Sequence, residues 1–401
     1  MNTRFAKRND YIKASEIREI LKVTEMPEMI SFAGGLPAPE LFPVEELKKV
    51  CEDVLNNNGQ SALQYSTTEG YIPLREAICK RMKNSGIETS TNNIIITTGS
   101  QQALDITGKL FIDEGDTVVC ESPTYLAAIS AFKAYMPKFE EVAMDEDGMI
   151  IEELEKILTN NPKVKFIYTI PDFQNPTGRT MSLSRRKKLI ELANRFDIVV
   201  IEDNPYGEVI FTGEKLPTLK QLDTEGRVVY VGSFSKIFAP GLRLGWICAE
   251  DTFIEKYVPL KQSIDLHTNI FAQIITSRYM EMFDIEAHIA EIRKTYKHRS
   301  ELMIKCIKEE FPENTKHTLP NGGLFVWVEL PQNIDANEVF KIAIKNKVAF
   351  VPGQPFFPNG NIKNAFRLNY SNMPDERIIE GIKRLGEVLK KFYINTNSNL
   401  Q

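Results

Sequence analysis

One stretch of the sequence decides the fold: residues 228–245 read VVYVGSFSKIFAPGLRLG. A short apolar run, typical of a buried strand, leads to Lys236 among serine hydroxyls, and Arg243 follows after a Pro-Gly turn. The lysine amine could form a Schiff base with an aldehyde, while Ser233, Ser235 and Arg243 could hold a phosphate. The stretch therefore suits pyridoxal 5'-phosphate as cofactor. The alternative is a solvated lysine in a serine-rich loop.

The composition is that of a globular protein. The chain has 401 residues, of which 42% are hydrophobic and 26% charged, and its formal net charge is -5. This length allows two or three domains with a substantial core. Because basic and acidic residues are interspersed, the sequence favours small-molecule partners, and we expect neither nucleic acid nor a membrane as partner.

No targeting or metal-binding signal stands out in the sequence. The first 13 residues carry basic side chains but lack the apolar core of a secretion signal, and no later run is long and apolar enough to cross a bilayer. We therefore expect a cytoplasmic protein. The 5 cysteines are scattered without a Cys-x-x-Cys pair, and the 4 histidines show no metal-ligand spacing, so reduced thiols and no metal site are expected.

Short apolar runs alternate with amphipathic helical patterns through the first two thirds of the chain. The runs are 94–96, 118–120, 164–168, 198–201, 228–231 and 246–248, and the helical patterns are 101–111, 125–134, 150–159 and 184–196. This alternation predicts an α/β fold with a mostly parallel sheet covered by helices on both faces.

The remaining third predicts a smaller α+β part. A long helix is expected across 283–310, strands at 324–330, 348–351 and 365–370, and a last helix at 374–391. Near the N-terminus, helices are expected from 43 to about 56 and around 74–82. We place an N-terminal arm at 1–40, a large cofactor-binding domain at 41–285 and a small C-terminal domain at 286–401.

Polar residues follow several of the predicted strands, where an open parallel sheet binds its ligands. After run 94–96, Ser100 and Gln101 begin a helix whose free N–H groups could bind a phosphate, although Ser100 also suits a plain helix cap. After run 118–120, Tyr125 could stack on a cofactor ring or pack on the sheet.

The next two strands end in an amide and a carboxylate. Asn175 stands in a Pro-Thr-Gly turn and could donate to the phenolate oxygen of the cofactor, a position that Tyr206 could share. Asp203 ends a buried strand, where a carboxylate is costly unless paired, and a protonated pyridine nitrogen is a suitable partner. A helix cap is the alternative reading of Asp203.

Three motifs together resemble the fold-type I pyridoxal-phosphate aminotransferases of class I/II. They are Asn175-Pro176-Thr177-Gly178, Asp203-Asn204-Pro205-Tyr206, and Ser233-Phe234-Ser235-Lys236 through Arg243. Residues 31–37 and 99–104 look most similar to the branch of 2-aminoadipate and kynurenine aminotransferases. The resemblance implies a large domain with a seven-stranded, mostly parallel sheet, a smaller α+β domain, and an N-terminal segment that covers the active site.

The resemblance also implies a role for each matching residue. Lys236 would be the Schiff-base lysine, Asp203 the partner of the pyridine nitrogen, and Asn175 and Tyr206 the ligands of the phenolate oxygen. Tyr125 would stack on the ring. The residues expected around the phosphate are Ser100, Gln101, Ser233, Ser235 and Arg243.

Substrate contacts are implied by the same resemblance. Arg367 would take the substrate α-carboxylate through a two-bond fork, and Asn175 and Gly35 would lie beside the substrate. Arg18 could meet a side-chain carboxylate, or be a charge on an exposed helix. Tyr65 would reach the phosphate of the neighbouring subunit, which implies a homodimer with shared active sites. Candidates for an apolar wall are Leu36, Tyr71, Phe356 and Phe357.

The expected activity is reversible transfer of an amino group from an L-amino acid to a 2-oxo acid, with Lys236 as the base. Candidate donors are 2-aminoadipate, glutamate, and aromatic or branched-chain amino acids. One alternative is a fold-type I lyase or decarboxylase, which would use the same cofactor residues. The other is an effector-sensing domain of a transcription regulator, against which stands the short stretch of about thirty residues before residue 31.

Overall fold

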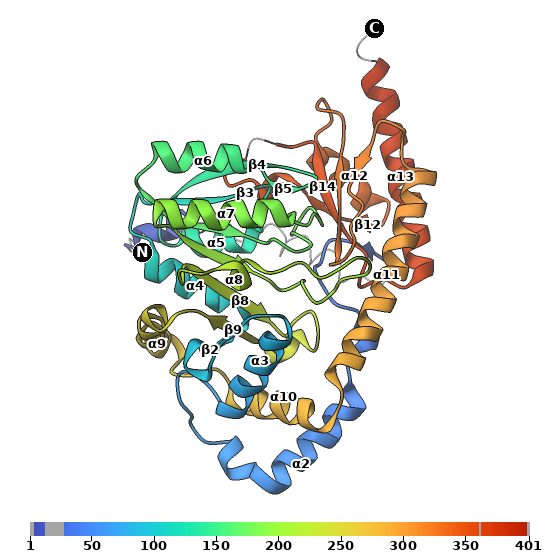
Figure 1. Ribbon diagram of the computed structural model, residues 1–401. Helices are drawn as coiled ribbons and strands as arrows, with labels where there is room; N and C mark the ends of the chain where they lie inside the picture. Colours follow the sequence, from blue (N-terminus) through green and yellow to red (C-terminus); the bar gives the residue numbers. More distant parts are fainter. Residues whose placement is uncertain (1–3, 13–27, 361, 399–401) are drawn as a thin grey trace.

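The structure is a computed structural model that describes residues 4–12, 28–360 and 362–398 (Figure 1). Arg18, the predicted side-chain contact of the substrate, lies outside the described residues. Among the described residues, no helix combines the length and the apolar character needed to cross a membrane.

The main sheet has the strand order β2-β9-β8-β7-β6-β3-β4-β5. In this order the strands are Ile94–Thr98, Leu244–Cys248, Val228–Ser233, Val199–Asp203, Val164–Thr169, Thr117–Ser122, Lys138–Asp145 and Gly148–Met149. The pairs from β8 through β7, β6 and β3 to β4 are parallel, whereas β9 runs antiparallel to both of its neighbours. Seven longer strands thus form the mostly parallel sheet that was predicted, and the two-residue β5 adds a hairpin to β4.

Helices cover both faces of this sheet, as Figure 1 shows. Helices α6 (Ile151–Asn160), α7 (Leu183–Phe196) and α8 (Leu219–Leu222) pack on one face, where they meet the side chains of Val119, Ile167 and Val200. The alternate side chains of the same strands face the other side. That side is covered mainly by α3 (Ile72–Asn84), α4 (Gly99–Phe111), α5 (Leu126–Lys133), α9 (Asp251–Asp265) and α10 (Ile270–Met282). Burial on both faces explains why the central strands are almost entirely apolar.

A second, antiparallel sheet is built from the C-terminal part of the chain. Its order is β10-β11-β14-β13, with bounds Lys316–His317, Phe325–Glu329, Ala365–Asn369 and Val351–Pro352. The helices of the same C-terminal part are α11 (Ile285–Glu310), α12 (Ala336–Lys345) and α13 (Asp375–Ser398). The N-terminal strand β1 (Ile30–Ser31) pairs in parallel with β12 (Val348–Ala349), so residues 30–31 are attached to this C-terminal part.

Most predicted elements are present, with two notable differences. Strand β4 was missed because it is a charged edge strand in which only Val142 is buried, so it lacks an apolar run. Helix α2 (Val44–Ala62) extends beyond its predicted end near Asn56, with a non-helical backbone at Asn58 inside it. The three-part domain division remains a prediction.

A buried arginine fixes the loop that follows β6. Arg186 on α7 is fully buried and donates to the carbonyl oxygens of Pro171, Met181 and Pro217. Its guanidinium also lies 2.6 Å from Oδ1 of Asp172. Because this loop continues to Asn175, the arginine holds a site-forming segment in place.

We expect Arg186→Met to lower the free energy of unfolding by about 3–5 kcal/mol, because Asp172 would be left buried without an opposite charge and would keep only the hydrogen bond from Asn204. Urea denaturation followed by circular dichroism measures this loss. The matched control is Arg195→Met, which breaks an exposed pair with Glu155 on the same helix and should cost less than about 1 kcal/mol. Equal losses in the two variants would contradict this account of Arg186.

Candidate active site

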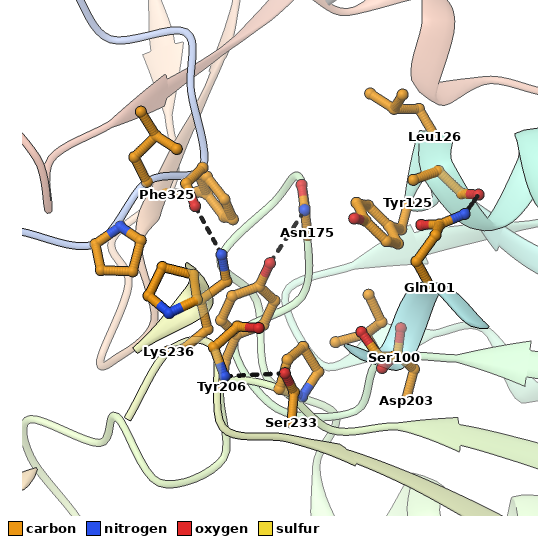
Figure 2. Close-up of a pocket in the computed structure, with 18 of the residues that line it drawn as sticks. Ser100, Gln101, Tyr125, Leu126, Asn175, Asp203, Tyr206, Ser233, Lys236 and Phe325 are labelled. Atoms are coloured by element: carbon orange, nitrogen blue, oxygen red, sulfur yellow. Dashed lines mark hydrogen bonds between the residues drawn. The ribbon is translucent and has the colours of Figure 1, made fainter. Parts of the chain in front are cut away.

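A cavity of about 420 Å³ lies at the carboxyl ends of the main-sheet strands. It is closed by Phe325 and Arg367 of the second sheet and by residues 35–37, and Figure 2 shows the side chains that line it. This volume lies in the range of small-molecule sites. The residues that were predicted for the site and that line the cavity are Gly35, Ser100, Gln101, Tyr125, Asn175, Asp203, Tyr206, Ser233, Ser235, Lys236, Arg243 and Arg367.

Lys236 follows β8 and extends into the cavity. Its Nζ donates to the carbonyl oxygen of Gly35 at 2.7 Å. Enclosure by the protein lowers the pKa of Lys236 to about 8, and the positive charges of Arg367 and Arg243 act in the same direction. About a tenth of this amine is therefore uncharged at pH 7, far more than for an ordinary lysine, and the uncharged form is a nucleophile and a base.

Asp203 ends β7 and is 1% exposed. Its Oδ2 accepts a hydrogen bond from the Tyr168 hydroxyl at 2.8 Å, whereas its buried Oδ1 has no partner among the described residues. Burial raises the pKa of this carboxyl to about 7, and the hydrogen bond from Tyr168 opposes that rise. A buried oxygen without a hydrogen-bond partner costs free energy, so we expect a ligand to donate a hydrogen bond to Oδ1.

Asn175, Tyr206 and Arg367 form a connected group on another wall of the cavity. The Asn175 amide nitrogen lies 3.2 Å from the Tyr206 hydroxyl, and its Oδ1 accepts from Arg367 at 2.7 Å. Arg367 also donates to the carbonyl oxygen of Ala33 at 2.7 Å, and its guanidinium lies 4.1 Å from the centre of the Phe325 ring. Because Arg367 is buried, its pKa is lowered to about 10, yet it stays charged at neutral pH.

Nε of Arg367 is buried and finds no hydrogen-bond partner in the described part of the chain. The guanidinium therefore keeps an unused donor, and the two hydrogen bonds that it makes in the described residues go to neutral oxygens. An anion such as a carboxylate would supply the missing charge and acceptors.

A second anion-binding corner forms where α4 begins. Gly99 has φ +71°, and a Cβ added there would stand 2.5 Å from the Arg243 guanidinium. A Cβ on Gly245 would stand 2.8 Å from the backbone of Gly99 and Ser100. These two glycines therefore allow Arg243 and the N-terminus of α4 to approach each other closely. Ser233 Oγ accepts from the Ser235 N–H at 3.1 Å, and both residues line the same cavity.

Two further predicted residues lie on the wall next to α5. Gln101 donates through its amide nitrogen to the Ala127 carbonyl oxygen at 3.1 Å, an interaction drawn in Figure 2. Burial raises the pKa of Tyr125, which directly precedes α5, to about 12, so its hydroxyl stays protonated.

Tyr65 does not join the cavity of its own chain. Its side chain is 79% exposed, and its ring meets His267 edge-on with 5.9 Å between ring centres. Of the predicted apolar wall, Leu36 lines the cavity. Phe356 lies behind Arg367, with the guanidinium 5.2 Å from its ring centre. Phe357 and Tyr71 are not among the residues that line the cavity.

Several residues of the site were missed from the sequence, and three of them matter for the argument. They are Tyr168, which holds Asp203, Phe325, which packs on Arg367, and Ile170, which lines the cavity. Tyr168 was counted only as part of an apolar strand, although a hydroxyl inside a buried run requires a partner. That requirement was the available signal. Phe325 lies about 150 residues from Asn175 in sequence, and nothing in its local pattern indicates the site.

Comparison with known proteins agrees with this geometry. Residues 28–385 match the family model of aminotransferase class I and II. Aromatic-amino-acid aminotransferase 1 of Thermococcus litoralis is 48% identical over 385 residues, which are 95% of this chain and 92% of that protein.

Two solved structures are also similar along nearly their whole length. The kynurenine aminotransferase of Pyrococcus horikoshii, crystallised with PMP, has a TM-score of 0.93 at 46% identity, over 96% of this chain and 97% of that one. LysN, the α-aminoadipate aminotransferase of Thermus thermophilus, was crystallised with N-(5'-phosphopyridoxyl)-L-leucine. It has a TM-score of 0.91 at 40% identity, over 97% of this chain and 98% of that one.

We expect Lys236 of the ligand-free protein to react with acetic anhydride with a pH midpoint of about 8. Only the uncharged amine reacts, so at pH 7 about a tenth of Lys236 would be reactive, roughly two hundred-fold more than for an amine of pKa about 10.4. Peptide mass spectrometry after trace labelling measures this midpoint.

An Arg367→Gln variant serves as the comparison for this labelling. Removing its positive charge should move the Lys236 midpoint to higher pH, since that charge favours the neutral amine. A midpoint at the ordinary lysine value in the unaltered protein would show that the cavity does not activate this amine.

Proposed function

The chain belongs to aminotransferase class I and II, and from this membership we propose that Lys236 is its catalytic amine and that its donors include aromatic amino acids and 2-aminoadipate. The protein is a transaminase that uses pyridoxal 5'-phosphate and acts on amino acids and 2-oxo acids. One observation carries the proposal. Lys236, Arg367 and Asp203, whose Oδ1 has no partner within the described ranges, all line one cavity.

The residues of the cavity fit pyridoxal phosphate. Oδ1 of Asp203 lacks a donor among the described residues, the close approach of Gly99 and Gly245 allows an anion to bind beside Arg243, and Lys236, whose pKa is lowered, lines the same cavity. When bound, the cofactor supplies an aldehyde for the amine of the substrate and a protonated pyridine ring that accepts the electron pair of the α-carbon.

Each part of the cofactor has candidate partners in this chain. Oδ1 of Asp203 would hold the ring N–H, and Tyr125 would lie against the ring. The amide of Asn175 and the hydroxyl of Tyr206 would hold the phenolate oxygen. The proposed partners of the phosphate, together with the first N–H groups of α4, are Ser100, Gln101, Ser233, Ser235 and Arg243.

Arg367 is the proposed partner of the substrate α-carboxylate. Its unused Nε and its charge, which meets only neutral oxygens in the described residues, favour an incoming carboxylate in the fork geometry. Asn175 shares a hydrogen bond with this guanidinium and would orient it, and Gly35 would line the substrate position. The α-carbon of a bound amino acid would thereby be held in the cavity that Lys236 enters.

Lys236 is the proposed carrier of the proton. With a pKa of about 8, Nζ is able both to take a proton from the α-carbon and to give one back near neutral pH. The carbonyl oxygen of Gly35 accepts a hydrogen bond from Nζ in this structure, and it would also accept one from the protonated amine.

The proposed substrate range rests on the relatives and on the cavity wall. The relatives are named for aromatic amino acids, kynurenine and α-aminoadipate, and Leu36, Ile170 and Phe325 supply apolar surface. A contact between Arg18 and a side-chain carboxylate remains a prediction, as does a cytoplasmic location. Mixing the yellow cofactor-bound protein with a panel of amino acids tests the range, because true donors bleach the colour and release a 2-oxo acid.

We also propose a homodimer in which Tyr65 reaches the phosphate site of the neighbouring subunit. Leu63 and Leu266 are 76% and 42% exposed, and Tyr65 lies against His267 beside Leu266. Exposed apolar side chains that gather in this way are typical of an interface. A contact with a second subunit would give this exposed tyrosine a function.

Lys236→Ala is expected to lower kcat by at least about a hundred-fold, the usual contribution of a positioned acid–base group. Steady-state transamination of phenylalanine with 2-oxoglutarate measures this. Lys294→Ala on the exposed face of α11 is the matched lysine control and should leave kcat unchanged. Retained turnover in Lys236→Ala would remove this residue from the mechanism.

Mixed dimers test the contribution of Tyr65. Tyr65→Phe and Lys236→Ala subunits should each be impaired alone, yet after denaturation and joint refolding they should recover activity. The recovery is expected because a mixed dimer has one cavity with an intact Lys236 and an intact Tyr65 from the other chain. Placing both substitutions in one chain and mixing it with unaltered chain provides the control. Absence of recovery would contradict a shared site.

A further inference from the structure

Tyr168 holds a position in the site that the proposed roles above do not use. It lies on β6, in register with Ile201 of the neighbouring β7, and Asp203 follows two residues later on the same face of the sheet. The Tyr168 hydroxyl lies 2.8 Å from Oδ2 of Asp203. Both side chains are 1% exposed, so this hydrogen bond is shielded from water.

The bond leaves the two oxygens of Asp203 in different situations. Oδ2 has its donor in the protein, and Oδ1 is buried with none in the described ranges. The Tyr168 ring is itself fixed, because it packs edge-on against Phe132 with 5.6 Å between ring centres. Burial and the charge of Asp203 raise the pKa of Tyr168 well above its ordinary value, so the hydroxyl acts only as a donor.

Building on the proposed function, we propose that Tyr168 is a positioning residue: its hydroxyl holds Oδ2 of Asp203 and so reserves Oδ1 for the protonated ring nitrogen of the cofactor. Tyr168 does not line the cavity and acts through Asp203 alone. Within the described part of the chain, Tyr168 is the one side chain that donates a hydrogen bond to Asp203.

The hydrogen bond also favours the charged form of Asp203. Tyr125, Tyr206 and Glu121 face this carboxylate as well, and Lys236 shares the cavity with it. The two tyrosines stay protonated because their pKa values are raised, and Glu121 is bonded to other partners. Tyr168 therefore supplies the hydrogen bond that opposes protonation of Asp203. A neutral Asp203 would not hold a cationic ring nitrogen.

A double-mutant cycle tests the proposal by measuring the affinity of the cofactor-free protein for pyridoxal 5'-phosphate. The chains compared are the unaltered protein, Tyr168→Phe, Asp203→Asn and the double variant. Tyr168→Phe should weaken binding about ten-fold or more, as expected for a lost hydrogen bond to a charged group. In the Asp203→Asn background the same change should matter less than about two-fold, because the charge it supports is gone.

The pH dependence of this affinity gives a second measurement. Binding is lost at low pH as Asp203 becomes protonated, and Tyr168→Phe should move this loss to higher pH by about one unit. Replacing Tyr168 with 3-fluorotyrosine keeps the ring and strengthens the donor, so it should move the loss to lower pH. This second variant also serves if Tyr168→Phe folds poorly, which urea denaturation would reveal.

Tyr257→Phe is the matched control, since Tyr257 is equally buried and its hydroxyl contacts Thr107 outside the cavity. It should change neither affinity nor pH dependence. If Tyr168→Phe weakens binding equally in both backgrounds, or has no effect while Asp203→Asn does, the positioning role is wrong and the proposed function stands. If Asp203→Asn itself leaves binding unchanged, the cofactor role of Asp203 in the proposed function fails.

Discussion

Buried charge at the carboxyl edge of the main sheet is the constraint on which the rest of the structure depends. Asp203 and Arg367 are buried and Lys236 is partly buried, and none of them is paired with an opposite charge among the described residues. Such burial is destabilising unless a ligand supplies the missing partners. The pKa of Lys236 is lowered to about 8 and that of Asp203 is raised to about 7, because burial disfavours the charged form of each.

Two separate sheets are needed to build this arrangement. Parallel strands bring Lys236, Asp203 and Asn175 to one edge, although more than 60 residues separate the first of these from the last. Arg367 comes from the antiparallel second sheet and reaches across to Asn175. Gly35 comes from the segment after β1, which is attached to β12 of the C-terminal part. The cavity therefore exists only when distant parts of the chain have assembled.

The sequence was sufficient for features that depend on local pattern, and insufficient for those that depend on register between strands. Continuous apolar runs predicted the central strands, and the residues after them predicted about half of the cavity wall. Strand β4 was not predicted because a largely exposed strand near the sheet edge needs no apolar run. Tyr168 was not predicted because its contact with Asp203 depends on strand pairing. Phe325 was not predicted because its contact with Arg367 depends on sheet packing. Local spacing in the sequence encodes neither.

Two buried carboxylates with similar pKa values differ in how completely their oxygens are hydrogen-bonded. Glu121 and Asp203 are each 1% exposed, and burial raises the pKa of each to about 7. Glu121 accepts from the Thr169 hydroxyl, the Ile170 N–H and the Gln174 amide, so both of its oxygens are satisfied within the protein. It thereby fixes the turn before Asn175. Asp203 has one satisfied oxygen and one without a donor in the described part of the chain, a difference that a shifted pKa alone does not reveal. The difference lies in the hydrogen bonds, and it supports a structural role for Glu121 and the proposed ligand contact of Asp203.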